Sequence, residues 1–181
     1  MGGLRAFNTQ ALTPSLRETI LGHWRHVAEA SGLAFNPGAL DRDGFVYDTE
    51  PACRAVVTVR ETDPPKAFPF LEAIQRAFYR DGRDVTQAAV LVDIAAAQGL
   101  AGDAFQAGFE SQAMREATKR DFATTQALGV GGFPTLAAGE GPRITLVTAG
   151  YVGADVLESR LEDLERGGPL KTGDRPLFPR R

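Results

Sequence analysis

Few residues in this chain carry side chains suited to chemistry. Its 181 residues include one cysteine, Cys53, which excludes an internal disulfide. Exchange between a dithiol and a disulfide passes through a mixed disulfide that a second thiol must resolve, so one cysteine cannot complete the cycle. Cys53 stands in the first turns of an expected helix, a position that favours a thiolate, but it shares an apolar face with Val56 and Val57. We therefore expect a buried, structural cysteine.

The histidines and the clustered acids do not have the spacing of a metal site. His23 and His26 stand at i and i+3 on an expected helix, whereas the common metal-binding pair stands at i and i+4. Asp41, Asp43 and Asp48 lie in a loop that lacks the glycine and terminal glutamate of a calcium-binding loop. We expect no metal, no cofactor and no catalytic side chain in this chain.

The stretch GVGGFPTLAAG, from Gly129 to Gly139, contains the most informative pattern. Two glycines and a proline stand immediately before an apolar run that is typical of a strand. A proline is tolerated at the first residue of a strand because its missing N–H falls outside the hydrogen-bond ladder. Pro134 therefore marks the position where a strand begins.

A series of helices and one hairpin must position these residues. Thr13, Thr86 and Ser111 are the expected caps of three helices, and the stretch 32–48 predicts a long loop. PTLAA and ITLVT, separated by GEGPR, predict a β-hairpin. Helices are expected over 13–31, from 48 or 49 to about 62, and over 68–80, 86–98, 103–109, 111–128 and 153–166.

Composition favours one globular domain and names no partner. The chain is 43% hydrophobic and 24% charged, and 20 basic residues against 23 acidic ones give a net charge of -3. This balance provides no electrostatic attraction for nucleic acid or for an acidic membrane surface. No apolar run has the length of a membrane span and the N-terminus lacks a signal-peptide pattern, so we expect a cytoplasmic protein.

Several segments together resemble one known family. GVGGFPT, at 129–135, and ITLVTAGYVGADVLESRL, at 144–161, resemble the C-terminal part of the DsbA family of thiol-disulfide oxidoreductases. GHW, at 22–24, and TEPACRAV, at 49–56, are similar to its branch of predicted protein-disulfide isomerases. The resemblance covers about residues 2–166. It implies an α/β, thioredoxin-like fold of DsbA type with a large helical insertion.

The resemblance also implies a division of the chain. Residues 1–12 correspond to a remnant of the second thioredoxin strand and a linker, and residues 13–110 to the helical insertion. Residues 111–167 correspond to the C-terminal thioredoxin half, with a helix, the proline-headed strand, the hairpin strand and a closing helix, and 168–181 form a tail. The family's first strand and its C-x-x-C helix have no counterpart here, so we expect an N-terminally truncated, mostly helical fold with a small sheet.

In the family, the proline at this position is cis and the residue before it hydrogen-bonds an extended substrate segment. The resemblance therefore assigns substrate binding to Gly132, Phe133, Pro134 and Thr135, with an extended peptide or a protein thiol or disulfide as partner. Without the dithiol, this chain is expected to be inactive in redox turnover, whereas a longer gene product would be an active oxidoreductase or isomerase.

Two alternatives stay open at this point. The chain is a non-redox module that binds a peptide or a partner strand, or it is a relative of the kappa-type glutathione transferases and hydroxychromene-carboxylate isomerases, which share this fold. The oligomeric state is not predicted by the sequence.

Overall fold

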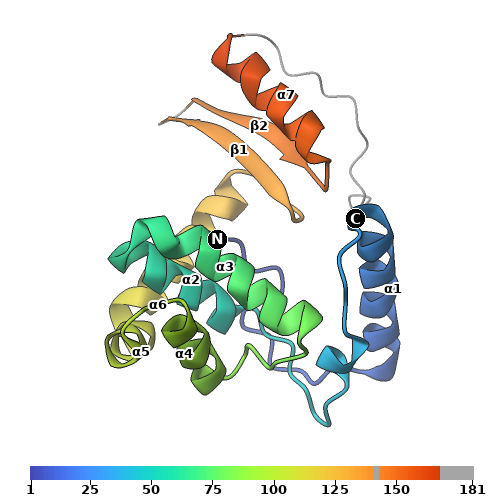
Figure 1. Cartoon of the computed structure of the whole chain (residues 1–181), viewed down its shortest axis with the longest axis vertical. Helices are drawn as coiled ribbons and strands as arrows, with labels where there is room; N and C mark the ends of the chain where they lie inside the picture. Colours follow the sequence, from blue (N-terminus) through green and yellow to red (C-terminus); the bar gives the residue numbers. More distant parts are fainter. Residues whose placement is uncertain (141–142, 168–181) are drawn as a thin grey trace. The chain divides into compact units, whose positions relative to one another are not determined.

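The computed structural model describes residues 1–140 and 143–167, so the expected tail 168–181 lies outside the described residues. It is mostly helical, with one antiparallel pair of strands (Figure 1). The helices are α1 Pro14–Ser31, η1 Pro37–Leu40, α2 Glu50–Thr62, η2 Pro64–Lys66, α3 Ala67–Gln75, η3 Arg76–Arg80, α4 Ala88–Ala97, α5 Gly102–Glu110, α6 Gln112–Ala127 and α7 Ala154–Glu165; the strands are β1 Thr135–Glu140 and β2 Arg143–Ala149.

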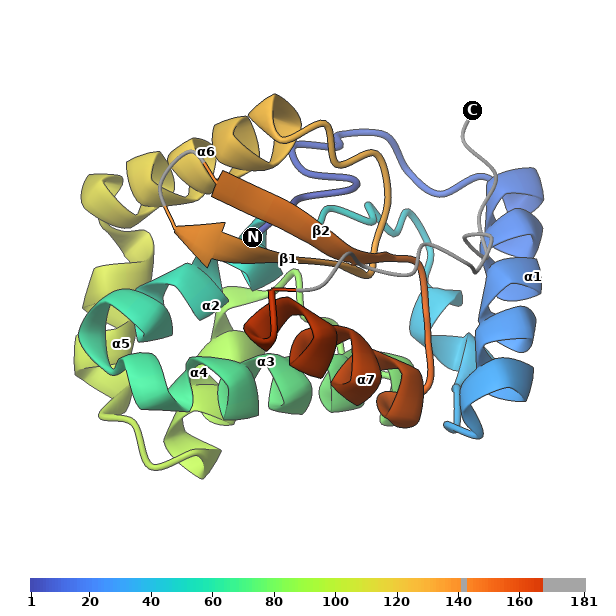
Figure 2. The same ribbon diagram turned by 90° about the horizontal axis from the view of Figure 1, so that it is seen from above.

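The chain divides into two compact units, residues 1–123 and 124–181. The first unit contains the helices α1 to α5 and most of α6, and α1 lies on the opposite flank of this unit from α5 in both ribbon views (Figures 1 and 2). The second unit contains the hairpin and α7.

The start of α1 follows the sequence prediction closely. Thr13 is the N-cap, and its Oγ1 accepts a hydrogen bond from the N–H of Leu16 at 3.2 Å. Pro14 occupies the first turn, where its missing N–H costs nothing. The helix ends at Gly32, whose φ of 71° is the left-handed conformation that glycine adopts without strain. The expected helix over 13–31 is thus confirmed.

The core of the first unit joins side chains that are far apart in the sequence. Trp24 of α1 packs edge-on against Phe78 and Tyr79, with ring centroids 5.7 and 5.1 Å away. The expected loop 32–48 contains the short helix η1, and the N–H of Asn36 donates to the carbonyl of Tyr79 at 2.7 Å. The largest fully buried side chains are Phe70, Leu40, Leu91, Val57, Val59, Thr58 and Thr118.

The expected cap of the fourth helix is wrong. Helix α4 begins at Ala88 with Gln87 as its N-cap, and Thr86 does not cap it. The Thr86 hydroxyl instead donates to Oδ1 of Asp84 at 2.6 Å, and the same oxygen accepts the N–H of Thr86 at 3.0 Å. An aspartate two residues upstream thus competes successfully for the threonine, as Asx turns do. By contrast, Ser111 caps α6 as expected, because its Oγ accepts the N–H of Met114 at 3.2 Å.

The hairpin in the second unit has one irregularity. Strand β1 pairs antiparallel with β2 from Thr135 opposite Ala149 onward, and the register slips between Leu136 and Ala137. Val147 is the extra residue of this bulge, since it has no Cα partner on β1. Its carbonyl accepts a hydrogen bond from Nη1 of Arg160 on α7 at 3.1 Å. The packed helix therefore supplies the partner that the ladder lacks at this point.

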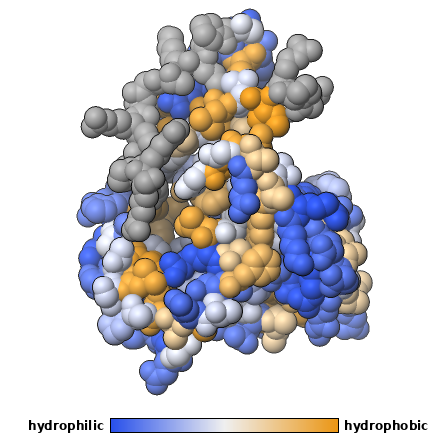
Figure 3. All heavy atoms as spheres, turned by 180° about the vertical axis from the view of Figure 1, so that it is seen from behind, coloured by the Kyte–Doolittle hydropathy of each residue, from blue (hydrophilic) through white to orange (hydrophobic). Residues whose placement is uncertain are grey.

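Apolar side chains also remain on the surface of each unit. Leu4, Leu33 and Phe68 are exposed in the first unit, and Ile144 and Leu146 are exposed on β2. Figure 3 shows such apolar spheres among hydrophilic ones on the rear face of the molecule. The exposed residues Ile144 and Leu146 alternate along the strand and so share one face of the hairpin.

Candidate functional site

The predicted binding segment forms the turn that leads from α6 into β1. Gly129 has a φ of 69° just after α6, where a left-handed residue ends the helix. The Phe133–Pro134 peptide bond is cis. Oγ1 of Thr135 donates to the carbonyl of Gly132 at 2.7 Å, which closes a short turn across the proline. The four predicted residues are therefore brought together in one tight segment.

The backbone of this segment is held on one side only. The carbonyl of Pro134 accepts the N–H of Gly150 at 2.8 Å, which extends the hairpin pairing to the proline. Among the hydrogen bonds of residues 1–140 and 143–167, none engages the N–H or the carbonyl of Phe133. Pro134 is exposed and Phe133 is half-buried. Backbone groups in this state are able to pair with an added strand.

The outer edge of β1 offers more groups of the same kind. In the described part of the chain, β1 pairs only with β2, so its other edge carries no strand. An exposed strand edge is a template for another extended segment. We call the unpaired edge of β1 together with the backbone of Phe133 the Phe133 edge, and unpaired backbone groups of this kind suit an extended peptide.

Cys53 belongs to a different part of the chain from this edge. It lies on α2, in the first unit. Its side chain is buried, with 7% of the residue exposed, as expected from its apolar face. Burial is the main reason that the pKa of the thiol is raised to about 12, and the nearby carboxylate of Glu50 raises the pKa further. The thiol is therefore protonated at neutral pH and is a poor nucleophile.

Sequence reasoning missed a buried ion pair on the same helix, between residues one turn apart. Arg54 binds Glu50 through two hydrogen bonds of 2.7 and 3.2 Å, and its Nη1 donates to the carbonyl of Phe109 at 2.5 Å. The guanidinium also lies over the Phe109 ring, 4.0 Å from the centroid. Both charged residues are buried. A Glu and an Arg four residues apart usually indicate an exposed pair, so only the position of α5 reveals the burial.

The remaining polar candidates have structural roles. Oδ1 of Asp48 accepts the N–H groups of Phe7 at 2.8 Å and Glu50 at 2.9 Å, which ties the N-terminal segment to the start of α2. Asp41 is exposed and lies 3.6 Å from the half-buried Arg17 in an ion pair. Within the described residues, no group of three or more His, Cys, Asp or Glu residues is placed to hold a metal ion.

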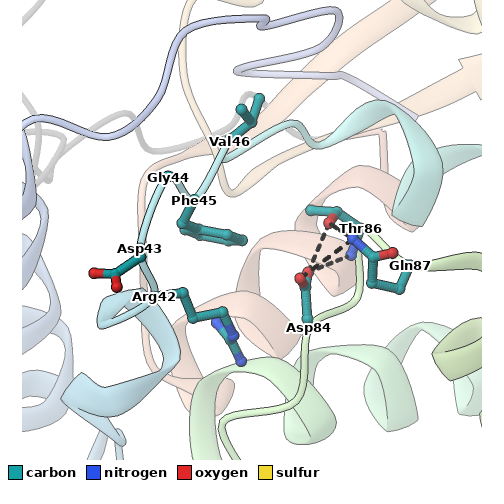
Figure 4. Close-up of a pocket in the computed structure, with 8 residues that line it drawn as sticks. All are labelled: Arg42, Asp43, Gly44, Phe45, Val46, Asp84, Thr86 and Gln87. Carbon is teal, nitrogen blue, oxygen red and sulfur yellow. Dashed lines mark hydrogen bonds between the residues drawn. The ribbon is translucent and has the colours of Figure 1, made fainter.

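A polar pocket of about 270 Å³ lies between the loop before α2 and the turn before α4. Two of its charged groups have partners inside the protein. The Arg42 guanidinium donates to the carbonyls of Ala39 and Gly82. Asp84 accepts a hydrogen bond from Thr86 (Figure 4). The Arg42 guanidinium also lies 5.2 Å from the ring centroid of Phe45. These contacts connect two loops, and no group in the pocket is set up as a nucleophile.

The comparisons with known proteins agree with the fold. The family model for the DSBA-like thioredoxin domain matches residues 9–162. The structure of a "putative protein disulfide isomerase" from Nitrosomonas europaea is similar with a TM-score of 0.85 and 38% identity, over 91% of this chain and 81% of that one. A comparison with curated proteins gave no match.

A second solved protein is similar at lower identity. The cytosolic disulfide reductase DsbM from Pseudomonas aeruginosa gives a TM-score of 0.76 and 29% identity, over 91% of this chain and 82% of that one. A structure of DsbM with GSH gives a TM-score of 0.74. No helix in the described residues of the present chain is long and apolar enough to span a membrane.

Proposed function

Because the chain belongs to the DSBA-like thioredoxin domain family, with its thioredoxin-like fold, we propose that it takes part in thiol-disulfide exchange by holding a substrate peptide. The bound segment is extended and pairs with the Phe133 edge, as a strand added to β1. One observation carries this proposal: the N–H and the carbonyl of Phe133 make no hydrogen bond to another described residue. The next residue, Pro134, is exposed.

The proposed role is binding rather than redox turnover. Resolution of a mixed disulfide needs a second thiol, and this chain has Cys53 alone, buried and protonated. A low-molecular-weight thiol would supply the exchanging thiol from outside the chain, and a structure of DsbM with GSH is among the similar structures. DsbM is described as cytosolic, and we propose the same compartment for the present protein.

A non-redox binding module is the second candidate function. The state of Cys53 favours it, because a buried thiol of raised pKa has no use in exchange. Both candidates predict peptide binding at the Phe133 edge and differ in whether the bound peptide is a thiol or disulfide substrate or any extended segment.

Peptide binding is tested by titrating an extended, unstructured peptide into isotope-labelled protein and following backbone amide signals. We expect the Phe133 N–H signal to shift and its hydrogen exchange to slow. Thr135→Val removes the hydrogen bond to the Gly132 carbonyl and should weaken peptide binding several-fold. Thr145→Val, at an exposed position on β2, is the matched control and should bind like the parent chain. Equal weakening by both variants, or shifts confined to other regions, would contradict the proposal.

Redox turnover is tested separately by insulin reduction with a dithiol as electron donor. We expect no rate above the donor alone, and no change in Cys53→Ser. A rate that disappears in Cys53→Ser would show that this thiol is catalytic. Binding of thiol-containing peptides without turnover supports the proposed role of holding a substrate. Equal binding of thiol-free peptides, again without turnover, favours the non-redox module.

A further inference from the structure

The first unit contains a second cavity, next to Cys53, that the proposed function does not use. Its volume is about 190 Å³, and we call it the Cys53 cavity. It is formed by the N-terminal segment, the first turns of α2, and α3 with the residues that follow it. The lining residues used below are Leu4, Asp48, Ala52, Leu71, Ile74 and Gln75, besides Tyr47, Cys53 and Phe78.

The deep part of this cavity is apolar and aromatic. Cys53, Ile74 and Phe78 are buried, and Leu71 and Ala52 pack partly against the core. The rings of Tyr47 and Phe78 lie 5.3 Å apart with an angle of 32° between their planes. A neighbouring aromatic ring gains from offset or edge-on contacts with such faces. The cavity interior therefore suits a flat apolar group.

The mouth of the cavity combines an exposed apolar side chain with hydrogen-bond acceptors. Leu4 is 68% exposed and so leaves apolar surface at the opening. Asp48 uses Oδ1 for two backbone N–H groups, and its Oδ2 accepts none of the hydrogen bonds found among the described residues. The side chain of Gln75 likewise makes no hydrogen bond to another described residue.

We propose that the Cys53 cavity binds a small uncharged aromatic compound that carries one hydrogen-bond donor, such as a phenol. An apolar protein cavity of about 150 Å³ takes up benzene, so about 190 Å³ accommodates a ring with a small substituent. The donor group faces Asp48 and Gln75, and the ring lies against Tyr47 and Phe78. The carboxylate of Asp48 disfavours an anionic ligand, because a like charge would be partly desolvated beside it. The Met1 ammonium, which also lines the cavity, is already paired with Asp121.

This site shares no residue with the Phe133 edge. It is also non-covalent, because the Cys53 thiol is held in its neutral form by burial. Ligand release therefore leaves the protein unmodified.

The test uses p-cresol as the probe and p-toluate, of nearly the same size but anionic, as the matched ligand control. Methyl signals of Leu71 and Ile74 are followed by NMR, with Leu91, buried elsewhere in the core and not in the cavity lining, as the internal reference. We expect saturable shifts of the two cavity methyls with p-cresol, no shift of Leu91, and at least tenfold weaker binding of p-toluate.

Two variants check the position of the site. Ala52→Leu fills the cavity and should weaken p-cresol binding at least tenfold, whereas Ala89→Leu, the same change at an exposed position of α4, should not alter it. Non-saturating shifts spread over exposed apolar residues, or equal affinity for p-cresol and p-toluate, would overturn the proposal even if Ala52→Leu fails to fold. Retained p-cresol affinity in a folded Ala52→Leu protein would also overturn it.

Discussion

The state of Cys53 makes a quantitative prediction about alkaline stability. Burial raises the pKa of this thiol from 9.0 to about 12 in the folded chain. The folded protein thus keeps the proton at pH values where the unfolded chain has released it. The stabilisation is complete below about pH 9 and is lost as pH rises from 9 to 12. At about 1.36 kcal/mol for each pH unit, the loss approaches 4 kcal/mol over the whole range.

The assay is urea denaturation at a series of pH values, followed by the fluorescence of Trp24, which is buried in the first unit. Cys53→Ala has no thiol to titrate, and its cavity penalty does not change with pH. The stability difference between the two proteins should therefore change by about 2–3 kcal/mol between pH 9 and 11. The pKa of Tyr47 is also raised by burial, but this tyrosine titrates in both proteins and its effect cancels.

Alkylation gives an independent measure of the same thiol. A pKa raised from 9.0 to about 12 lowers the thiolate population at pH 8 by roughly a thousandfold, so native Cys53 should react at least that much more slowly than the unfolded chain. Parallel pH dependence in the parent chain and in Cys53→Ala would refute the reasoning. Native alkylation at the rate of an exposed thiol would refute it as well.

Two further predictions concern stability. Arg54→Met leaves Glu50 buried without its partner and should lower the free energy of unfolding by about 3–5 kcal/mol, with much of the loss recovered when Glu50→Gln is added; urea denaturation of the single and double variants measures both values. Full stability of Arg54→Met would contradict the role of the buried pair. Thr13→Ala removes the cap of α1 and should cost about 1 kcal/mol in the same measurement, whereas Thr9→Ala, exposed and outside any helix, should cost little.

The sequence predicts those features of the fold that depend on neighbouring residues. Thr13 followed by Pro14 predicts the start of α1, and Ser111 predicts the cap of α6, because a capping side chain bonds a backbone group two or three residues away. Thr86 shows the limit of this reasoning, since Asp84 competes for it within the same local segment. The apolar face of α2 likewise predicts the burial of Cys53.

Features that depend on distant residues could not be predicted in this way. The burial of Arg54 requires α5, whose Phe109 carbonyl accepts its third hydrogen bond. The Cys53 cavity requires the N-terminal segment and α3 to meet over α2. At the candidate site, the proline motif and the family resemblance predicted the segment 132–135, but the unused backbone of Phe133 is visible only in the structure.

The bulge at Val147 has a consequence for how β2 tolerates changes of length. A bulge reverses the alternation of inward and outward positions along a strand, so the residues before Val147 are out of phase with those after it. This explains why two successive residues, Val147 and Thr148, are both buried. Deletion of Val147 would restore a regular ladder in which Leu146 still lies opposite Ala137 and Ile144 opposite Gly139, so both side chains would keep their face. The bulge therefore lets β2 lose this one residue without exchanging its two faces, and the loss would remove the carbonyl that accepts the hydrogen bond from Arg160.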